Sequence, residues 1–412
     1  MKILVVCQYY YPEPFRISDI CETLVKHCHE VTVLTGLPNY PEGRILDEYR
    51  HGKKRNEIIN GVKVIRSFEI GRGDSHLRLF LNYVSFAISA SLKAFFMKEK
   101  FDVILVNQLS PVLMAIPAMV YKKRRHKQMV IYCLDLWPDS LAAGGVSGES
   151  MVYRIFLNIS KWIYSSADKI LVTSSMFKDY YENVLSINSS NIEHLPQYAE
   201  DLFTQTKNET ATEIAAPSEE KIYKFVFAGN IGDMQSVDTI IKAANELRNY
   251  QNIQFHIVGD GSKSEECHNL TNSLGLENVK FYGRRPVQEM TGLYSMADAM
   301  LITLKDNKTL SYTLPGKIQS YMAAGKPIIG AINGEASRVI EESKSGLCCN
   351  AEDYTALSEL ILTFCNYDNK EQMAINAQKY YEQHYSKDKF MDSLENALKE
   401  LEERLCSTIK PY

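Results

Sequence analysis

The sequence lacks the patterns that mark metal, redox and dinucleotide chemistry. Its nine cysteines form no Cys-x-x-Cys pair and no Cys/His spacing that suits zinc, which favours reduced thiols in a cytosol. It contains no Asp-x-Asp and no His/Asp/Glu cluster with metal-ligand spacing. No strand-like run leads into Gly-x-Gly-x-x-Gly with an acidic residue about 20 positions later, so an NAD-dependent oxidoreductase is not indicated.

The chain also lacks strong charge, a leader and a clear membrane span. A net charge of -4 gives no overall attraction to nucleic acid. Met1-Lys2 runs into apolar residues without a small-residue cleavage site, which predicts a first strand and not a signal peptide. Leu77–Met97 approaches span length but contains Arg78 and Asn82 among other polar residues, so we expect no transmembrane helix.

Apolar, strand-like runs alternate with helical patterns along the whole chain. This alternation predicts an α/β fold in which parallel sheets are covered by helices on both faces. A chain of 412 residues with 45% hydrophobic residues is long enough for two such domains. The predicted strands are Ile3–Gln8, Val31–Leu34, Val62–Ser67, Val103–Asn107, Val130–Leu134 and Ile170–Thr173, then Phe225–Ala228, Phe255–Val258, Val279–Tyr282, Met300–Thr303 and Ile328–Ile332.

A change of composition separates the two series of strands. Residues 199–222 are rich in Asn, Thr, Ser, Glu and Pro, which is typical of a linker. We therefore predict domains at 1–198 and 223–385, joined by 199–222 and followed by a C-terminal helix at 386–412. Ser236 is predicted to cap the helix that begins at Val237.

The stretch from Thr303 to Gly346 carries the clearest site signal. Pro315-Gly316 suits the start of a short helix, and Gly325 suits its end. Lys317 lies in the first turn, where unpaired backbone N–H groups and the helix dipole favour an anion such as a diphosphate. The alternative is an ordinary strand–loop–helix–strand unit with a surface lysine.

This stretch also resembles a known family. It reads Pro-x-Lys-x-x-Ser-Tyr-Met-Ala-Ala-Gly-Lys-Pro-Ile from Pro315, followed by Gly334-Glu335 and Ser345-Gly346. The pattern is similar to the donor site of glycosyltransferase family 4, and within it to capsule and O-antigen enzymes typified by N-acetyl-L-fucosaminyltransferases. The resemblance implies the GT-B architecture, with two facing Rossmann-like domains and a last helix that crosses back to the first domain.

The resemblance places acceptor contacts in the N-terminal domain. The loop after the first strand has Pro-Phe-Arg where many relatives have two glycines, and it presents an aromatic face and a cation. Asp135 keeps the family's acidic residue and is the best candidate for contact with the reacting sugars; the alternative is that it caps the following turn. The predicted acceptor-binding residues are Tyr11, Phe15, Arg16, Asn39 and Tyr40.

Donor contacts are expected in the C-terminal domain, where the chain departs from the family. Asn230 and Gln235 replace a family Arg and Lys, so positive charge must come from Lys305 and Lys317, with Arg284 and Arg285 in reserve. Two family glutamates fall on Tyr312 and Ser320, which leaves Glu335 as a substitute carboxylate. The predicted catalytic residues are Asp135, Lys317 and Glu335; the predicted donor-binding residues are Gly229, Asn230, Gly232, Arg284, Lys305, Pro315, Gly316, Gln319 and Ser320.

The activity that the resemblance implies is sugar transfer. The expected enzyme is a retaining, metal-independent glycosyltransferase that uses a UDP-sugar, needs no cofactor, and acts on a polyprenyl-diphosphate-linked saccharide in capsule or O-antigen assembly. Two alternatives stay open: a nucleotide-sugar epimerase of the same fold, and a non-catalytic nucleotide-binding partner of a synthesis complex.

A basic cluster at 122–127 could dock the N-terminal domain on an anionic membrane. The apolar helix predicted over Leu77–Lys98 would contribute to the same contact. We therefore expect a cytoplasmic, peripheral membrane protein. The cluster has no aromatic partners, which argues against nucleic acid as the ligand.

Overall fold

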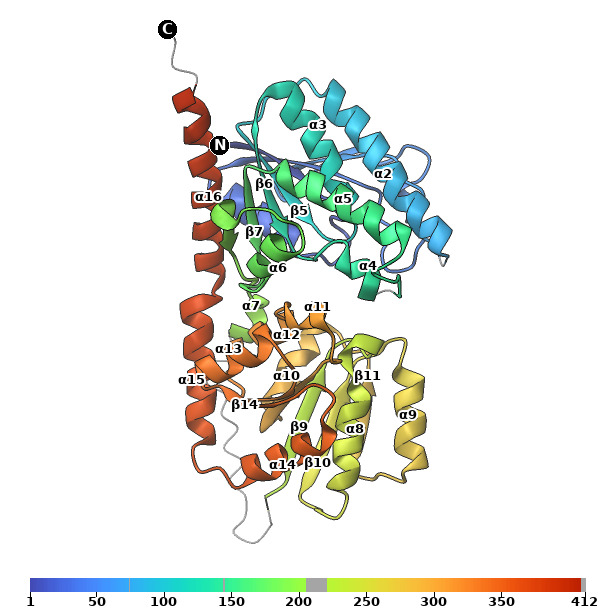
Figure 1. Ribbon diagram of the computed structural model, residues 1–412, viewed down its shortest axis with the longest axis vertical. Coiled ribbons are helices and arrows are strands. Elements are labelled where there is room, and N and C mark those ends of the chain that lie inside the picture. Colours follow the sequence, from blue (N-terminus) through green and yellow to red (C-terminus); the bar gives the residue numbers. More distant parts are fainter. Residues whose placement is uncertain (74, 144, 205–220, 409–412) are drawn as a thin grey trace. The chain divides into compact units, whose positions relative to one another are not determined.

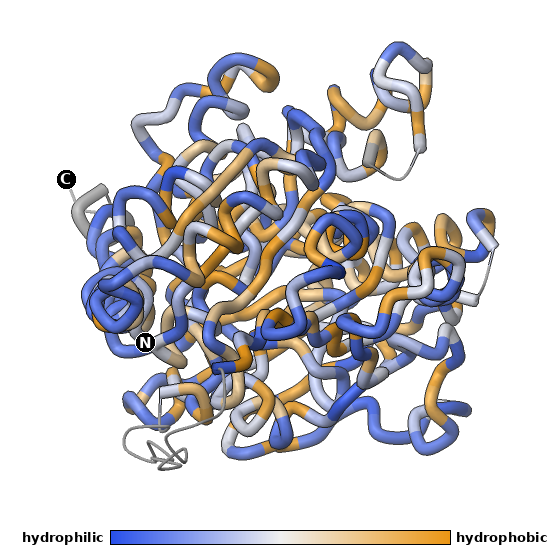
Figure 2. Tube along the Cα trace, turned by 90° about the horizontal axis from the view of Figure 1, so that it is seen from below, coloured by the Kyte–Doolittle hydropathy of each residue, from blue (hydrophilic) through white to orange (hydrophobic). Residues whose placement is uncertain are grey.

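The computed structural model describes residues 1–73, 75–143, 145–204 and 221–408. The chain forms two compact α/β units (Figure 1). Unit 1 comprises residues 1–195 together with 391–412, and unit 2 comprises residues 196–390. Hydrophobic segments run through the interior of the trace, and hydrophilic segments predominate in its outer loops and helices (Figure 2).

Unit 1 is built on one eight-stranded sheet of order β3-β4-β2-β1-β5-β6-β7-β8. All neighbouring strands are parallel except β3 and β4, which form an antiparallel pair. The continuous apolar run Ile3–Val6 is fully buried, as expected of a central parallel strand covered on both faces. The strands are β1 (Lys2–Val6), β2 (Glu30–Thr35), β3 (Asn56–Ile59), β4 (Val62–Arg66), β5 (Val103–Gln108), β6 (Gln128–Cys133), β7 (Lys169–Val172) and β8 (Ile192–His194).

Helices cover both faces of this sheet. One layer contains α2, α3 and α5, while α1 and α16 lie on the other side (Figure 1). The helices are α1 (Ile17–Lys26), α2 (His76–Phe96), α3 (Ile116–Arg125), α4 (Asp139–Ala143), α5 (Met151–Ser165), α6 (Phe177–Asn183) and α16 (Lys387–Thr408), with short 3-10 turns η1 (Asp47–Tyr49), η2 (Val112–Ala115) and η3 (Ser189–Asn191).

Helix α2 is, among the described residues, the one helix long and apolar enough to cross a membrane by length and composition. Its inner face nevertheless packs against unit 1, with Phe86, Ala90 and Ala94 fully buried. Asn82 is buried on the same face, where its amide oxygen accepts from Gln8 at 2.8 Å. In this fold α2 is therefore a covering helix of the sheet.

Helix α16 attaches to unit 1 through buried and half-buried charges. His27 Nδ1 lies 2.5 Å and His29 Nε2 3.3 Å from the carboxylate of Glu395. Lys169, which is almost fully buried at the start of β7, pairs with Glu400 and also lies 2.5 Å from Glu193. The helix begins at Lys387, whose ammonium lies 3.7 Å from Asp201 in unit 2.

Unit 2 contains a six-stranded, wholly parallel sheet of order β11-β10-β9-β12-β13-β14. Its strands are β9 (Tyr223–Ala228), β10 (Ile253–Val258), β11 (Val279–Gly283), β12 (Ala299–Thr303), β13 (Ile328–Ala331) and β14 (Gly346–Cys349). Its helices are α7 (Asp201–Thr204), α8 (Val237–Glu246), α9 (Ser264–Ser273), α10 (Met290–Ser295), α11 (Lys308–Ser311), α12 (Gly316–Ala323), α13 (Glu335–Ser343), α14 (Tyr354–Cys365) and α15 (Lys370–His384), with turns η4 (Asp233–Gln235) and η5 (Val287–Glu289).

Two hydrophobic clusters fill the two faces of this sheet. Because side chains alternate along a strand, Phe225 and Phe227 of β9 enter one cluster while Val226 and Ala228 enter the other. The second cluster also contains Ala199 and Phe203, so the predicted linker 199–222 begins inside unit 2. Residues 205–220 of that predicted linker lie outside the described residues.

One predicted cap is wrong. Ser236 stands before α8 but has a left-handed backbone, with φ 44° and ψ 48°, and its side chain accepts no hydrogen bond from the helix. Its hydroxyl instead lies 3.3 Å from Asp238 and 3.0 Å from Thr239. The left-handed turn points this side chain away from the free N–H groups that a capping serine would bind.

Candidate functional site

The strand order of each sheet reverses at one place, and the predicted site residues gather there. The reversal lies between β1 and β5 in unit 1 and between β9 and β12 in unit 2. Successive connections leave such a point towards opposite faces, so the carboxyl ends of the two strands border a crevice that commonly binds ligands. The loops after β9 and β12 carry predicted donor residues, those after β1 and β2 carry predicted acceptor residues, and the loop after β6 carries Asp135.

In unit 2 the loop after β9 is packed so tightly that two positions require glycine. Gly229 has φ +150°, and a Cβ there would lie 2.5 Å from Cε of Lys317. Gly259 has φ +139°, and a Cβ there would lie 1.8 Å from the carbonyl oxygen of Gly229. The N–H groups of Gly229 and Ile231 donate to the carbonyl oxygens of Val258 and Asp260. These backbone hydrogen bonds hold the loop after β9 against the loop after β10. Gly259, at the end of β10, is thus part of the same structure.

Lys317 places an unpaired ammonium beneath this loop. Its Nζ lies 3.9 Å from the centre of the Phe227 ring, and it is buried with no hydrogen-bond partner among the described residues. Burial lowers the pKa of Lys317 to about 7 because no nearby carboxylate compensates the lost hydration. A buried cation without a counterion is costly, so the arrangement favours an incoming anion.

The helix that carries Lys317 has the predicted boundaries. Pro315 is the N-cap residue, α12 begins at Gly316, and Gly325 follows the helix with φ +62°. Its first backbone N–H groups therefore lie next to Lys317, and they add a second anion-favouring feature.

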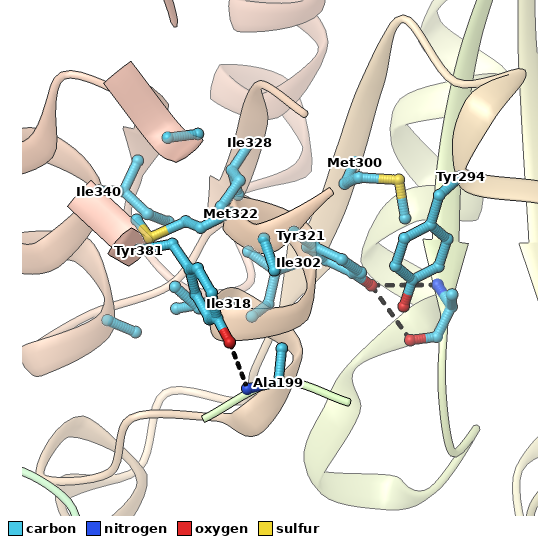
Figure 3. Close-up of a cluster of buried hydrophobic side chains, with 14 of the residues drawn as sticks. Ala199, Tyr294, Met300, Ile302, Ile318, Tyr321, Met322, Ile328, Ile340 and Tyr381 are labelled. Carbon is cyan, nitrogen blue, oxygen red and sulfur yellow. Dashed lines mark hydrogen bonds between the residues drawn. The ribbon is translucent and has the colours of Figure 1, made fainter. Parts of the chain in front are cut away.

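Tyr321 fixes α12 to the end of β9. Its hydroxyl accepts from the N–H of Ala228 at 3.2 Å and donates to the Ala228 carbonyl at 3.1 Å (Figure 3). Tyr321 is four residues after Lys317, so the two side chains share one face of the helix. This double hydrogen bond thereby sets the distance between Lys317 and the glycine loop.

Ser320 occupies one of the two places where a glutamate is missing, and another segment brings a carboxylate to it. The Ser320 hydroxyl lies 3.4 Å from Oε2 of Glu200 and 3.3 Å from the Gly316 carbonyl. Glu200 is half-buried and precedes α7. Sequence reasoning missed Glu200 because it lies 120 positions before Ser320, inside the predicted linker.

The remaining predicted donor residues are placed less directly. Lys305 lies 3.4 Å from Asp233, so its charge is already paired. The Asn230 amide donates to Gln235 at 3.2 Å, beside Gly232. Gln319 is buried and Arg284 is exposed.

Glu335, predicted as a substitute carboxylate for the site, is buried and forms an ion pair in the structure. It has no exposed area, and its two carboxylate oxygens accept from Arg338 at 2.8 and 3.1 Å. The ion pair forms because Glu335 and Arg338 are three residues apart at the start of α13. A catalytic role for Glu335 stays a prediction; in this arrangement the half-exposed Arg338 is the more accessible member of the pair.

In unit 1, Asp135 is half-buried two residues after β6 and turns back towards the loop after β5. Its Oδ2 accepts from the Ser110 N–H at 3.1 Å and from the Ser110 hydroxyl at 3.0 Å. The Trp137 indole donates to the same hydroxyl at 2.9 Å. Burial raises the pKa of Asp135, and these hydrogen bonds only partly oppose the rise. The observed partner is thus Ser110 and not the following turn.

An aromatic cluster lies at the same edge of the sheet. The rings of Tyr9 and Phe15 stack with centroids 5.1 Å apart, and Tyr40 lies 5.2 Å from Phe15. The guanidinium of Arg72 lies 5.7 Å from the Tyr40 ring centre. Tyr40 is partly exposed and Tyr11 more so, which leaves an aromatic surface beside the crevice. Arg16, also predicted here, is the N-cap residue of α1.

Asn39, predicted to contact the acceptor, makes internal hydrogen bonds instead of facing solvent in this structure, and its predicted role stays a prediction. Its side chain has no exposed area, because the amide donates to Glu69 at 2.6 Å and to the Leu37 carbonyl at 2.8 Å. Its oxygen accepts from the Arg72 N–H at 3.1 Å. Asn39 therefore shapes the loop that carries Tyr40.

Two buried glutamates that sequence reasoning missed hold this edge together. Glu13 accepts from the N–H groups of Tyr10, Asn39 and Tyr40, and burial raises its pKa to about 6. Glu69 is fully buried, and burial raises its pKa well above the usual range. The sequence carries one signal for Glu69, which is an acidic residue between apolar neighbours in the segment Phe68–Ile70.

Two Rossmann-like units, each with its site residues at the switch point of a parallel sheet, define a GT-B protein. The family models agree with this class. Residues 16–197 match the model "Glycosyltransferase Family 4", and residues 208–380 match "Glycosyl transferases group 1". The chain is thus a glycosyltransferase composed of a Family 4 domain followed by a group 1 domain.

Curated relatives are similar over much of the chain. A probable glycosyltransferase, WbjE of Pseudomonas aeruginosa, is 27% identical over 65% of this chain and 67% of its own. A putative colanic acid biosynthesis glycosyl transferase, WcaI of Escherichia coli, is 23% identical over 88% of this chain and 86% of its own.

Solved structures share the fold at low sequence identity. Sucrose-phosphate synthase from Thermosynechococcus elongatus aligns with a TM-score of 0.75 and 15% identity, covering 97% of this chain and 98% of that one. Anabaena HepE in complex with UDP and glucose aligns with a TM-score of 0.69 and 16% identity, covering 97% and 99%. These likenesses confirm the predicted fold class.

Proposed function

We propose that this protein is a retaining, metal-independent glycosyltransferase that moves a sugar from a UDP-sugar to a polyprenyl-diphosphate-linked saccharide. The product would be a repeat unit of a bacterial capsule or O-antigen, made on the inner face of the cytoplasmic membrane. An N-acetylated 6-deoxyhexose is the sugar that the resemblance to N-acetyl-L-fucosaminyltransferases favours. No cofactor is part of the proposal.

The observation that carries the proposal is the unpaired ammonium of Lys317. It lies at the N-terminus of α12, under the glycine loop after β9, at the switch point of the sheet. A nucleoside diphosphate supplies the missing negative charge. The neighbouring structure of HepE holds UDP, which supports a uridine nucleotide as the form of donor.

The same groups suit the chemistry of transfer. When the bond between sugar and diphosphate breaks, negative charge develops on the leaving oxygen, and Lys317 together with the α12 N–H groups would stabilise it. Among the described residues no group of three or more His, Cys, Asp or Glu gathers to hold a metal. We assign neutralisation of the leaving group to Lys317 and the α12 N–H groups. Retention would follow from attack on the face from which the diphosphate departs.

We assign Glu200 and Ser320 to the ribose of the donor. A carboxylate is the usual partner for paired sugar hydroxyls, and Glu200 lies 3.4 Å from Ser320 on the Lys317 helix. In unit 1 the aromatic surface of Tyr40 and Phe15, with Arg72 and Asp135, is the proposed acceptor side. The name of WcaI, a putative colanic acid biosynthesis glycosyl transferase, supports a role in the assembly of a bacterial saccharide.

Calorimetric titration tests the donor site. The wild-type protein should bind UDP in preference to GDP, ADP and NAD, and Lys317→Ala should weaken UDP binding at least about tenfold, as expected for loss of a charge-assisted contact. Lys280→Ala, on exposed strand β11 of the same unit, is the matched control and should leave binding unchanged. Preference for NAD, or equal loss in the control, would overturn the donor assignment.

Transfer itself is tested with radiolabelled UDP-sugars and lipid extracts from a capsule-producing bacterium. Label should move to the lipid phase with wild-type protein and not with Lys317→Ala. The anomeric configuration of the product, read by NMR, then decides between retention and inversion. Selective UDP binding without transfer of any sugar would favour the non-catalytic partner instead.

A further inference from the structure

Unit 1 exposes an unusual amount of large hydrophobic surface on one helix layer. More than half of the large hydrophobic side chains exposed in the described part of the chain lie on α2 and α5. On α2 they recur every three or four positions and so follow one helix face, opposite the buried Phe86, Ala90 and Ala94. The exposed residues are Leu77, Phe80, Leu81, Ile88, Leu92, Phe95 and Phe96 on α2, and Met151, Val152, Ile155 and Trp162 on α5.

Basic residues adjoin one end of this layer. The last turn of α3 contains Lys122, Lys123, Arg124 and Arg125 and is followed by His126 and Lys127. Lys122 pairs with Asp168, whereas Lys123, Arg124 and Lys127 form no ion pair with another described residue. Arg124 lies 4.7 Å above the ring of Phe95, so the charged and apolar parts are one continuous surface.

Between α3 and α5 this surface is hollowed. An open hollow of about 650 Å³ has apolar walls from Ile116, Met119 and Trp162 and a basic rim from Lys123, His126 and Lys127. An anionic phospholipid matches both halves: its phosphate suits the basic rim, and its first methylenes suit the indole and aliphatic walls. A soluble anion would satisfy only the rim.

We propose that the layer formed by α2, the end of α3, and α5 is the membrane-docking face of this protein, and that an anionic bilayer is its partner. Helix α2 lies in the plane of the interface with its apolar stripe among the upper acyl carbons, and the basic turn binds lipid phosphates. The proposal rests on the proposed function, which sets the reaction on the inner face of the cytoplasmic membrane. It adds the surface and the orientation with which the protein would contact that membrane.

The topology explains why such a face would serve the reaction. Helices α2 and α5 both begin at the edge of the sheet where strands β4 and β6 end, the edge that holds Asp135 and Tyr40. Exposed Leu77 and Met151 stand at those first turns. The lipid tail of an acceptor could therefore stay in the bilayer while its saccharide reaches the crevice of unit 1.

Vesicle flotation of the full chain, without substrates, tests the proposal. We use phosphatidylcholine vesicles with and without about one third phosphatidylglycerol. Wild-type protein should float with the anionic vesicles, and Lys123→Glu/Lys127→Glu should lower the partition coefficient at least about tenfold. Leu92→Ser/Phe96→Ser makes the exposed apolar face of α2 more polar and should lower the partition coefficient by a similar factor. Salt of about 0.5 M should weaken binding because the charged part is screened.

The control removes equal charge elsewhere in unit 1. Lys26→Glu/Lys53→Glu changes two exposed lysines, one on α1 and one before β3, and should leave flotation unchanged. Each variant is checked for an unchanged melting temperature and for UDP binding, which involves unit 2 alone. Three outcomes would refute the docking face. The wild-type protein floats with no vesicle, or the control variant loses as much vesicle binding as the test variant. The third is that light scattering shows a second copy of the chain bound over the apolar stripe. Because flotation needs no transfer, its failure and failure of the proposed reaction are read separately.

Discussion

The ammonium of Lys317 lies 3.9 Å from the centre of the Phe227 ring, beneath the glycine loop, without a hydrogen-bond partner among the described residues. The aromatic face offers the cation a weak electrostatic contact that does not replace its lost hydration. An anion bound at this place would therefore gain a partner that is already positioned. Two predictions follow from the energetics of this one side chain.

The first concerns the pH dependence of UDP affinity. The pKa of Lys317 is lowered to about 7 by burial, so the side chain of the free protein loses its proton as pH rises above 7. Binding of a diphosphate requires the charged form, and affinity should fall by up to about tenfold per pH unit above pH 7, until the pKa of the complex is passed. Calorimetry from pH 7 to 9 in two buffers measures both the fall and the accompanying proton uptake. A flat profile would show that Lys317 does not bind the diphosphate.

The second concerns stability. The pKa of Lys317 is lower in the folded than in the unfolded chain, so the burial penalty is complete below pH 7 and disappears as pH rises towards 10.5. Lys317→Met keeps the volume and removes the charge, and should raise the melting temperature by about 2 °C or more at pH 6. The gain should be smaller at pH 9. Lower stability of the variant at both pH values would mean that the ammonium has a partner in solution.

Glu200 gives a prediction about the ribose. If its carboxylate binds the ribose hydroxyls, wild-type protein should prefer UDP to 2′-deoxy-UDP by about tenfold, the value of one charge-assisted hydrogen bond. Glu200→Gln should lose most of that preference while it still binds 2′-deoxy-UDP normally. Asp201→Asn, at the neighbouring position, is the control for local disturbance. An unchanged preference in Glu200→Gln would remove Glu200 from the site.

Asp135 gives a prediction that separates transfer from donor binding. Asp135→Asn preserves the acceptor atom for the Ser110 N–H but removes the charge. The rate of transfer should fall by about 100-fold or more, the usual effect of losing an acid–base or charge-stabilising group. UDP affinity should change by less than about twofold, because that measurement reports unit 2. Equal loss of both quantities would instead indicate a folding defect.

An element could be predicted from the sequence where residues close together in the chain determine it. The start and end of α12 followed from Pro315 and Gly325, since each residue has few backbone alternatives. The central strands followed from continuous apolar runs. The short edge strands β3 and β8 were missed because their outer faces are exposed and their sequences are polar.

The site was less predictable because its details depend on contacts between distant positions. The sequence indicates that Lys317 suits an anion, but only the fold shows that its ammonium has lost both water and partners. Asn39 was read as a sugar-binding residue, and the buried Glu69 that takes its amide is 30 positions away. Glu200 reaches Ser320 across 120 positions, so no local motif could have joined the two.

The path of the chain through the two units has a consequence for biogenesis. Unit 2 is one continuous segment, whereas unit 1 is completed by the residues from Met391 onward, where Glu395 bonds to His27 and His29 and Glu400 pairs with Lys169. During synthesis unit 2 can finish folding first, while unit 1 still lacks α16 and the side chains of His27, His29 and Lys169 lack their partners. Premature termination before α16 would thus damage the end of the protein that was made earliest.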